Sequence, residues 1–113
     1  MRCVFIPVLA AAVFLVAGTA QAEPSVANGR VVFMKVGCYE CHGTQGQGGG
    51  AGPRIAPDPL PFDGLAAFVR ASSGEMPPYT TTLLSDSDLA DIYAYLQSIP
   101  RPPALADVPL LKQ

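Results

Sequence analysis

The sequence is poor in the side chains that most often bind metals or catalyse reactions. It has one histidine, three cysteines and a formal net charge of only −2 over 113 residues. A chain this weakly charged has no electrostatic means of attracting nucleic acid, so we expect no nucleic-acid partner. No stretch has the pattern of a β-strand, and there is no internal repeat. The length fits one small domain, which usually needs a disulfide, a metal or a cofactor to be stable.

The N-terminus has the pattern of a secretory signal peptide. Arg2 is followed by an apolar run over residues 4–17 and then by the small-residue sequence Ala20-Gln21-Ala22. We predict cleavage after Ala22, which makes residues 1–22 a signal peptide and places the mature protein in the periplasm. The alternative is an uncleaved membrane anchor, but the apolar run is shorter than the ~20 residues that span a bilayer. We therefore expect no transmembrane span after cleavage.

Three stretches of the mature chain have helical periodicity, and they predict an all-α domain over residues 23–99. We expect Ser25, Asp63 and Ser85 to cap their N-termini. Gly74 is expected to end the second helix and Pro100 the third. The predicted helices cover residues 25–36, 64–72 and 86–98.

Two segments lack this periodicity. Residues 43–61 are rich in glycine and proline, and residues 100–113 form a proline-rich tail. A long structureless loop inside a compact domain is uncommon unless it has a function, so we expect the first segment to serve a functional site. We expect the tail to be extended or weakly ordered.

Residues Cys38-Tyr39-Glu40-Cys41-His42 form a C-x-x-C-H motif, which is typical of c-type haem attachment. Each thiol adds to one haem vinyl group and forms a thioether, and one turn of chain can hold both. His42 follows directly, so its imidazole reaches the iron from the same side. After signal cleavage Cys38 and Cys41 are the last two cysteines, and a covalent haem c would stabilise a domain this small.

The motif has four alternatives to haem attachment. A disulfide between Cys38 and Cys41 would close too small a loop to add much stability. A thioredoxin-like redox pair requires a βαβ context. A zinc site requires about four ligands, and the mature chain offers three soft ones. The fourth alternative is a chance match. The export signal and the use of both remaining cysteines favour haem c, with its iron.

The second axial ligand of the iron is predicted by elimination. His42 is the single histidine, so the sixth ligand is methionine, lysine, an amine or water. Met34 lies too close before Cys38 to reach the opposite face of the haem. Met76 stands before two prolines that restrict the backbone, and we predict it as the ligand. The alternative is a methionine that fills a gap in the core.

With these features the sequence resembles a class I cytochrome c of the small bacterial monohaem group. That family has a glycine and an aromatic residue before the motif, a Gly-Pro pair after it, a later Met-Pro pair and an aromatic-leucine pair in the last helix. The resemblance covers most of residues 25–99 and implies about three main helices, with loops wrapped around one covalent haem. The matching residues are Gly29, Phe33, Gly52-Pro53, Met76-Pro77 and Tyr95-Leu96.

The resemblance also implies particular contacts. Gly29 would let the first and last helices cross closely, with Phe33 and Tyr95 packed at the crossing. The carbonyl group of Pro53 would accept the ring N–H of His42 and so fix the orientation of the imidazole.

Arg54 and Tyr79 each flank a haem-loop motif, so they are candidates to hydrogen-bond the haem propionates. The alternative is a solvated arginine and an ordinary surface tyrosine.

The predicted ligand set indicates an electron carrier rather than an enzyme. Histidine and methionine together fill the iron coordination, which leaves no position for a substrate. The expected partners are redox proteins: a periplasmic dehydrogenase or quinol-oxidising complex as donor, and a terminal oxidase or reductase as acceptor. One alternative is a fixed cytochrome subunit of a periplasmic dehydrogenase complex, with the tail as a docking strap. Another is a five-coordinate haem enzyme or gas sensor, which requires Met76 to be off the iron.

Overall fold

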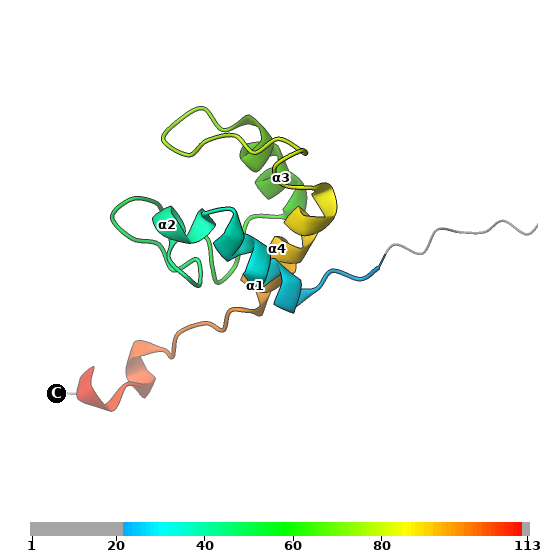
Figure 1. Ribbon diagram of the computed structural model, residues 1–113. Helices are drawn as coiled ribbons and strands as arrows, with labels where there is room; N and C mark the ends of the chain where they lie inside the picture. The colour runs from blue at the N-terminus through cyan, green and yellow to red at the C-terminus, as the bar shows by residue number, and fades with distance from the viewer. Residues whose placement is uncertain (1–21, 112–113) are drawn as a thin grey trace, which may run out of the picture.

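The structure, a computed structural model, describes residues 22–111 as helices joined by loops (Figure 1). Within these residues there is no β-strand, which confirms the predicted all-α class. No helix in this range is long and apolar enough to cross a bilayer. The predicted signal peptide lies outside the described residues, except for Ala22. The helices are α1 (Val26–Lys35), α2 (Cys38–His42), α3 (Phe62–Ala71) and α4 (Asp86–Ser98), followed by the 3-10 helices η1 (Leu105–Asp107) and η2 (Pro109–Leu111).

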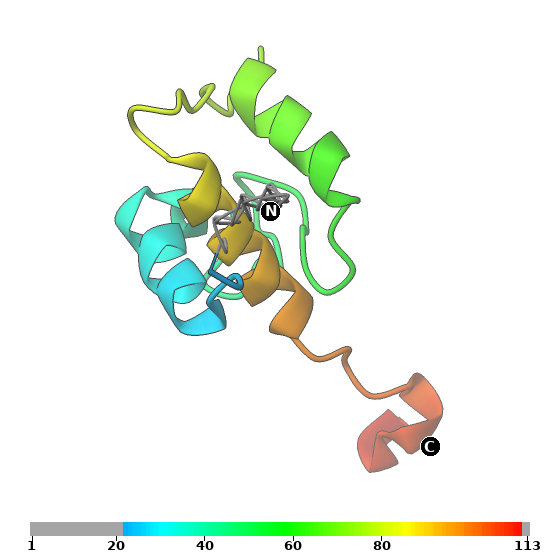
Figure 2. The same ribbon diagram turned by 90° about the vertical axis from the view of Figure 1, so that its right-hand side faces the viewer.

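Helices α1 and α4 pack against each other at the centre of the fold, with α3 on the far side of α4 (Figure 2). Gly29 marks their closest approach, because a Cβ atom there would overlap the backbone carbonyl of Asp91. Phe33 is fully buried and meets Tyr95 edge to face, with ring centroids 5.7 Å apart. The predicted close crossing of the first and last helices is confirmed.

The ends of α1 and α4 follow the sequence signals. The hydroxyl group of Ser25 accepts the backbone N–H of Asn28 at 3.2 Å, and that of Ser85 accepts the backbone N–H of Asp88 at 3.1 Å. Each bond satisfies one of the free N–H groups of a first helical turn. Helix α4 ends just before Pro100, as predicted.

Helix α3 begins earlier than its periodicity predicts. It starts at Phe62, and its N-cap is Pro61, whose side chain makes no capping bond. The first turn closes instead through the backbone, since the carbonyl of Pro61 accepts the N–H of Leu65 at 3.0 Å. The prediction that Asp63 caps this helix was wrong. Asp63 lies inside the first turn, where the helix dipole favours a carboxylate.

The other end of α3 also differs from the prediction. The helix ends at Ala71, and Ser72, whose backbone is not helical, is its C-cap, so Gly74 is not the stop signal. The hydroxyl group of Ser72 donates to the carbonyl of Met76 at 2.9 Å. The chain therefore turns away from the helix axis before it reaches the glycine.

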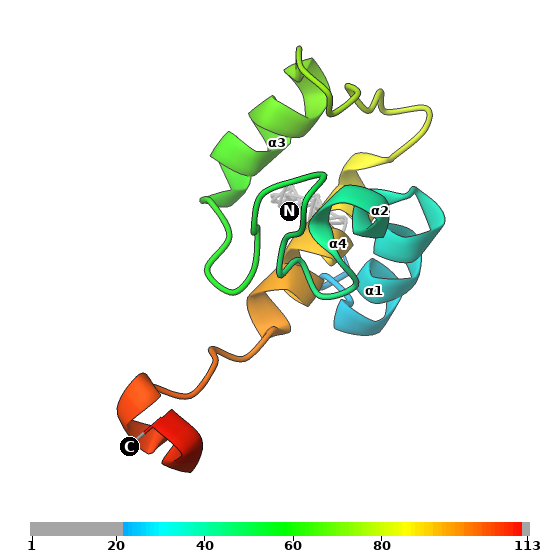
Figure 3. The same cartoon turned by 90° about the vertical axis from the view of Figure 1, so that its left-hand side faces the viewer.

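The glycine-rich segment over residues 43–61 is an ordered part of the domain (Figure 3). The N–H groups of Ile55 and Ala56 both donate to the carbonyl of Gly46, at 2.8 and 2.9 Å. Gly48 donates to the carbonyl of His42 at 2.8 Å and has a φ angle of 84°, which favours glycine. Ala56 is 1% exposed. This loop thus contributes to the core as well as to the site.

The tail leads away from the α-helices in all three ribbon views (Figures 1–3). We expected it to be extended or weakly ordered, but it forms the two short helices η1 and η2. Neither of them packs against α1–α4 in the described part of the chain. An ion pair of 2.7 Å between Arg101 and Asp58 joins the start of the tail to the loop before α3. Leu105 and Leu110 remain exposed.

Candidate functional site

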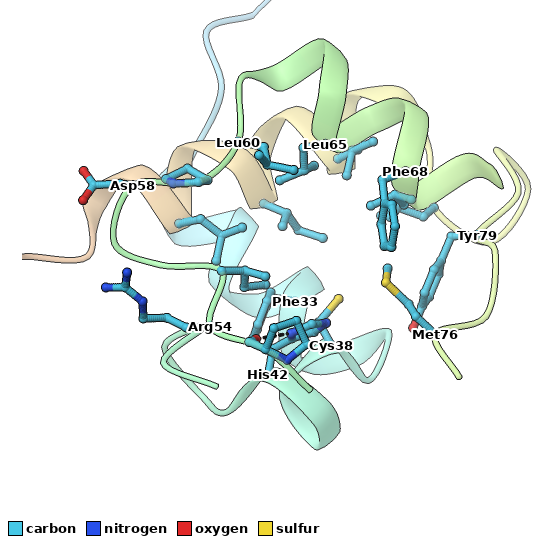
Figure 4. A pocket seen from close by; sticks show the side chains of 18 residues that line it. Phe33, Cys38, His42, Arg54, Asp58, Leu60, Leu65, Phe68, Met76 and Tyr79 are labelled. Atoms are coloured by element: carbon cyan, nitrogen blue, oxygen red, sulfur yellow. Dashed lines mark hydrogen bonds between the residues drawn. The ribbon is translucent and has the colours of Figure 1, made fainter. Parts of the chain in front are cut away.

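An apolar cavity of about 410 Å³ lies among the four α-helices (Figure 4). Its volume is within the range of ~300–1,000 Å³ that is usual for small-molecule and cofactor sites. Its lining includes Phe33 of α1, Leu96 of α4, and Leu65 and Phe68 of α3. The cavity is therefore built from segments that are far apart in the sequence.

Nearly all of the predicted site residues meet at this cavity. Cys41 is the exception: it lies on α2 with Cys38 but is exposed and does not line the cavity. The others come from α2, the loop before α3 and the segment after α3. The common location agrees with a shared role in holding a cofactor, and that role stays a prediction. The predicted residues that line the cavity are Cys38, His42, Pro53, Arg54, Met76 and Tyr79.

Helix α2 is a single turn that carries both cysteines and the histidine of the motif. Because residues three and four apart lie on one helix face, Cys41 and His42 each lie about one turn from Cys38, and Cys38 and His42 both line the cavity. The two cysteines form no disulfide, and before haem attachment burial raises the pKa of the Cys38 thiol to about 11.

The imidazole of His42 is oriented by the backbone of the loop between α2 and α3. His42 is 8% exposed, and its Nδ1 lies 2.8 Å from the carbonyl oxygen of Pro53, the pairing that the family resemblance implies (Figure 4). A carbonyl group can only accept, so Nδ1 carries the proton and donates it. The lone pair is then on Nε2, which is the atom left to bind a metal.

Met76 enters the same cavity from the segment that follows α3 (Figure 4). The carbonyl of Met76 accepts the hydroxyl of Ser72 at 2.9 Å. Further along, the N–H of Tyr79 donates to the carbonyl of Val69, and the guanidinium of Arg70 donates to the carbonyl of Tyr79, both at 2.9 Å. These bonds attach both sides of the methionine segment to the end of α3.

The two candidates for propionate binding are placed differently. The hydroxyl of Tyr79 donates to the carbonyl of Val36 at 3.0 Å, so its one proton already has a partner. Burial also raises the pKa of Tyr79. Arg54 is exposed, and its guanidinium points away from the centre of the cavity (Figure 4). Propionate binding by either residue stays a prediction.

Several cavity residues were not predicted from the sequence. Leu65, Phe68 and Val69 form the apolar stripe of α3, and this stripe lines the cavity although α3 buries none of its own residues. Leu60 also lines the cavity. The available signal was the combination of a strongly apolar face on α3 with the nearby haem motif. Ser72, which bonds to Met76, belongs to no sequence motif that could have revealed it, since a single serine can have many roles.

The residues present fit a covalently held haem. The cavity is apolar, with one thiol and one imidazole on α2 and one thioether from another segment. The zinc alternative lacks a ligand set, because no three His, Cys, Asp or Glu side chains gather to hold a metal within residues 22–111. The thioredoxin-like alternative lacks its βαβ context over the same range.

An all-α fold with a C-x-x-C-H turn beside an apolar cavity defines a small c-type cytochrome. The sequence profile of the family described as "Cytochrome C oxidase, cbb3-type, subunit III" matches residues 24–96, and the chain belongs to this family. The chain is similar to the "4-cresol dehydrogenase (hydroxylating) cytochrome c subunit" of Pseudomonas putida, at 31% identity over 97 residues. That match covers 86% of this chain and 82% of the relative. No solved structure gives a significant match.

Family membership confirms three of the sequence predictions. The chain is a small monohaem c-type cytochrome, and it carries covalently bound haem c with its iron. Its activity is electron transfer, as a carrier rather than as an enzyme in itself.

Proposed function

We propose that this chain is an exported carrier of single electrons whose haem is attached at Cys38 and Cys41 and ligated by His42 and Met76. The observation that supports this most directly is the buried imidazole of His42. Its Nδ1 donates to Pro53, so Nε2 is left as a ligand in the cavity that Met76 also lines. The partners we propose are a periplasmic dehydrogenase or quinol-oxidising complex and a terminal oxidase or reductase.

The protein residues adapt the site to electron transfer. The bound haem supplies an iron that accepts and releases one electron. The hydrogen bond between His42 and Pro53 fixes the imidazole and raises its basicity as a ligand. The neutral thioether of Met76 favours the ferrous state and so raises the reduction potential. The apolar residues of α3 and α4 would shield the haem from water, and iron ligation by both His42 and Met76 would leave no position for a substrate.

Visible spectroscopy of the mature holoprotein tests the Met76 ligand. We expect a low-spin ferric spectrum with the weak red-edge band of methionine ligation, and a ferrous spectrum that carbon monoxide does not change. Met76→Ala should lose the band and bind carbon monoxide. Met34→Ala is the matched control, since Met34 lies on α1 and does not line the cavity. A high-spin wild-type spectrum that shifts with carbon monoxide would instead support the five-coordinate enzyme or sensor.

A fixed cytochrome subunit of a dehydrogenase complex is the second candidate function. It is favoured by the relative from Pseudomonas putida, which is named as such a subunit, and by the exposed apolar residues of the tail. Purification of the native protein at raised salt separates the two candidates. Co-purification with one catalytic subunit in a fixed ratio would favour the fixed subunit, and a free cytochrome would favour the mobile carrier.

We propose that residues 1–22 are a signal peptide, residues 23–99 the cytochrome domain and residues 100–113 a separate tail. The apolar run and the Ala20-Gln21-Ala22 sequence support cleavage after Ala22 and export to the periplasm. The intact mass of the protein from a periplasmic extract should equal that of a chain beginning at Glu23 plus one haem. A mass that includes residues 1–22 would contradict cleavage.

A further inference from the structure

The C-terminal end of α3 holds the backbone of Met76 through one side chain. Ser72 is 8% exposed, and its hydroxyl donates to the carbonyl of Met76 at 2.9 Å. The next residue, Ser73, is exposed. Ser72 is thus a buried polar side chain, unlike Ser73, and its hydrogen-bond partner is Met76, which lines the cavity.

The rest of the methionine segment has few means of fixing Met76. Gly74 is exposed, and a Cβ atom added there would meet nothing within 4 Å, so this part of the segment is unpacked. Pro77 and Pro78 have no N–H to donate. Tyr79 is held by α3, but it lies three residues beyond the methionine. Among the hydrogen bonds of residues 22–111, the bond from Ser72 is the one that reaches Met76 itself.

We propose that Ser72 is a positioning residue that keeps Met76 directed into the cavity as an iron ligand. The inference rests on the proposed ligation by Met76. Without the hydroxyl, the carbonyl of Met76 loses its donor, and the segment over residues 73–78 gains conformational freedom. The state with Met76 detached is then more populated. An external ligand binds that state, so its apparent affinity rises in proportion.

Titration of the ferric holoprotein with imidazole measures this effect through loss of the red-edge band. Ser72→Ala should lower the imidazole concentration at half-conversion by about two- to tenfold, the change expected for one net hydrogen bond. Ser73→Ala is the matched control and should titrate like the wild type. Equal titration of Ser72→Ala and wild type, with the band present in both, would overturn the inference and leave the Met76 ligand in place.

A second pair of variants covers the case in which Ser72→Ala does not mature. Ser72→Thr keeps the hydroxyl, and Ser72→Val has nearly the same shape without it. The inference requires Ser72→Val to bind imidazole more tightly than Ser72→Thr, and equal affinities would overturn it. If Met76 is not an iron ligand at all, the outcome is different: the wild type lacks the red-edge band, or Met76→Ala keeps it. That result would contradict both the iron ligation by Met76 and the positioning role of Ser72.

Discussion

At the scale of single residues, hydrogen-bond partners decide what each side chain can do. The hydroxyl of Tyr79 donates to the carbonyl of Val36 at 3.0 Å, which links the methionine segment to the end of α1. Tyr79→Phe leaves that carbonyl without its donor, so we expect a loss of about 1 kcal/mol in the free energy of unfolding. Urea denaturation of the ferric holoprotein measures it. Tyr93→Phe is the control, because its ring keeps the edge-to-face contact with Phe62.

The same hydroxyl predicts a dependence of stability on pH. Burial raises the pKa of Tyr79 above its ordinary value of about 10. The folded state therefore holds this proton more tightly than the unfolded state. The stability from this group is full below the ordinary pKa and is lost as the pH rises through the folded-state pKa. The difference in unfolding free energy between wild type and Tyr79→Phe should shrink above about pH 10. A constant difference at high pH would argue against the donor role.

The site residues differ in how far the sequence could reveal them. Cys38 and Cys41 belong to a motif whose spacing follows from the chemistry of attachment, so they could be predicted from the sequence alone. Met76 could be predicted as a ligand by elimination, because the chain has one histidine and few methionines. Ser72 could not be predicted, because its role depends on where the chain turns after α3. A pattern of residue types does not specify that turn.

At the scale of elements, the crossing of α1 and α4 depends on the absence of a side chain at Gly29. Gly29→Ala places a Cβ atom against the backbone of Asp91, which cannot move aside as a side chain would. We expect a loss of about 1–3 kcal/mol in the free energy of unfolding, the usual cost of overpacking. Urea denaturation of the ferric holoprotein provides the measurement.

Gly64 on α3 is the matched control for this substitution. A Cβ atom there meets nothing within 4 Å, so Gly64→Ala should be neutral or stabilise by up to about 1 kcal/mol through helix propensity. If Gly29→Ala were as stable as Gly64→Ala, the two helices would have to be further apart than the structure places them.

Helix boundaries were predictable where a side chain marks them. Ser25 and Ser85 form real caps, so the predicted starts of α1 and α4 were confirmed. Helix α3 has a proline before its first turn and no capping side chain, which is why its start was placed too late. Helix α2 was not predicted as a helix, because one turn is too short to show periodicity.

At the scale of the whole molecule, the fold and the site share the same residues. Helix α3 buries none of its own residues, and its apolar stripe lines the cavity. The buried core is formed by α1 and α4, with Ala56 from the glycine-rich loop and Leu84 before α4. The sequence could predict the helix class, but not that one helix faces the cofactor site more than the protein core. That arrangement depends on how the loops on both sides of α3 bend.

The tail provides a test of how the molecule divides into parts. It is joined to the domain by the ion pair between Arg101 and Asp58, whose side chains are 76% and 53% exposed. Such exposed pairs contribute about 0–1 kcal/mol. A chain that ends at Pro100 should therefore unfold at nearly the same urea concentration as the full chain. A loss of several kcal/mol would mean that the tail packs on the domain.

The same truncation separates the two candidate functions. If the chain is a fixed subunit anchored by the apolar residues of its tail, the shortened protein should lose its catalytic partner during purification at raised salt and keep its visible spectrum. Leu105→Ser with Leu110→Ser in the full chain is the matched variant, since both side chains are exposed and their replacement leaves the domain intact. Equal loss in the truncated and substituted proteins would assign the docking to these apolar side chains. If both proteins keep the catalytic partner, the contact lies on the cytochrome domain. The tail would then be needed neither for the stability of the fold nor for its assembly.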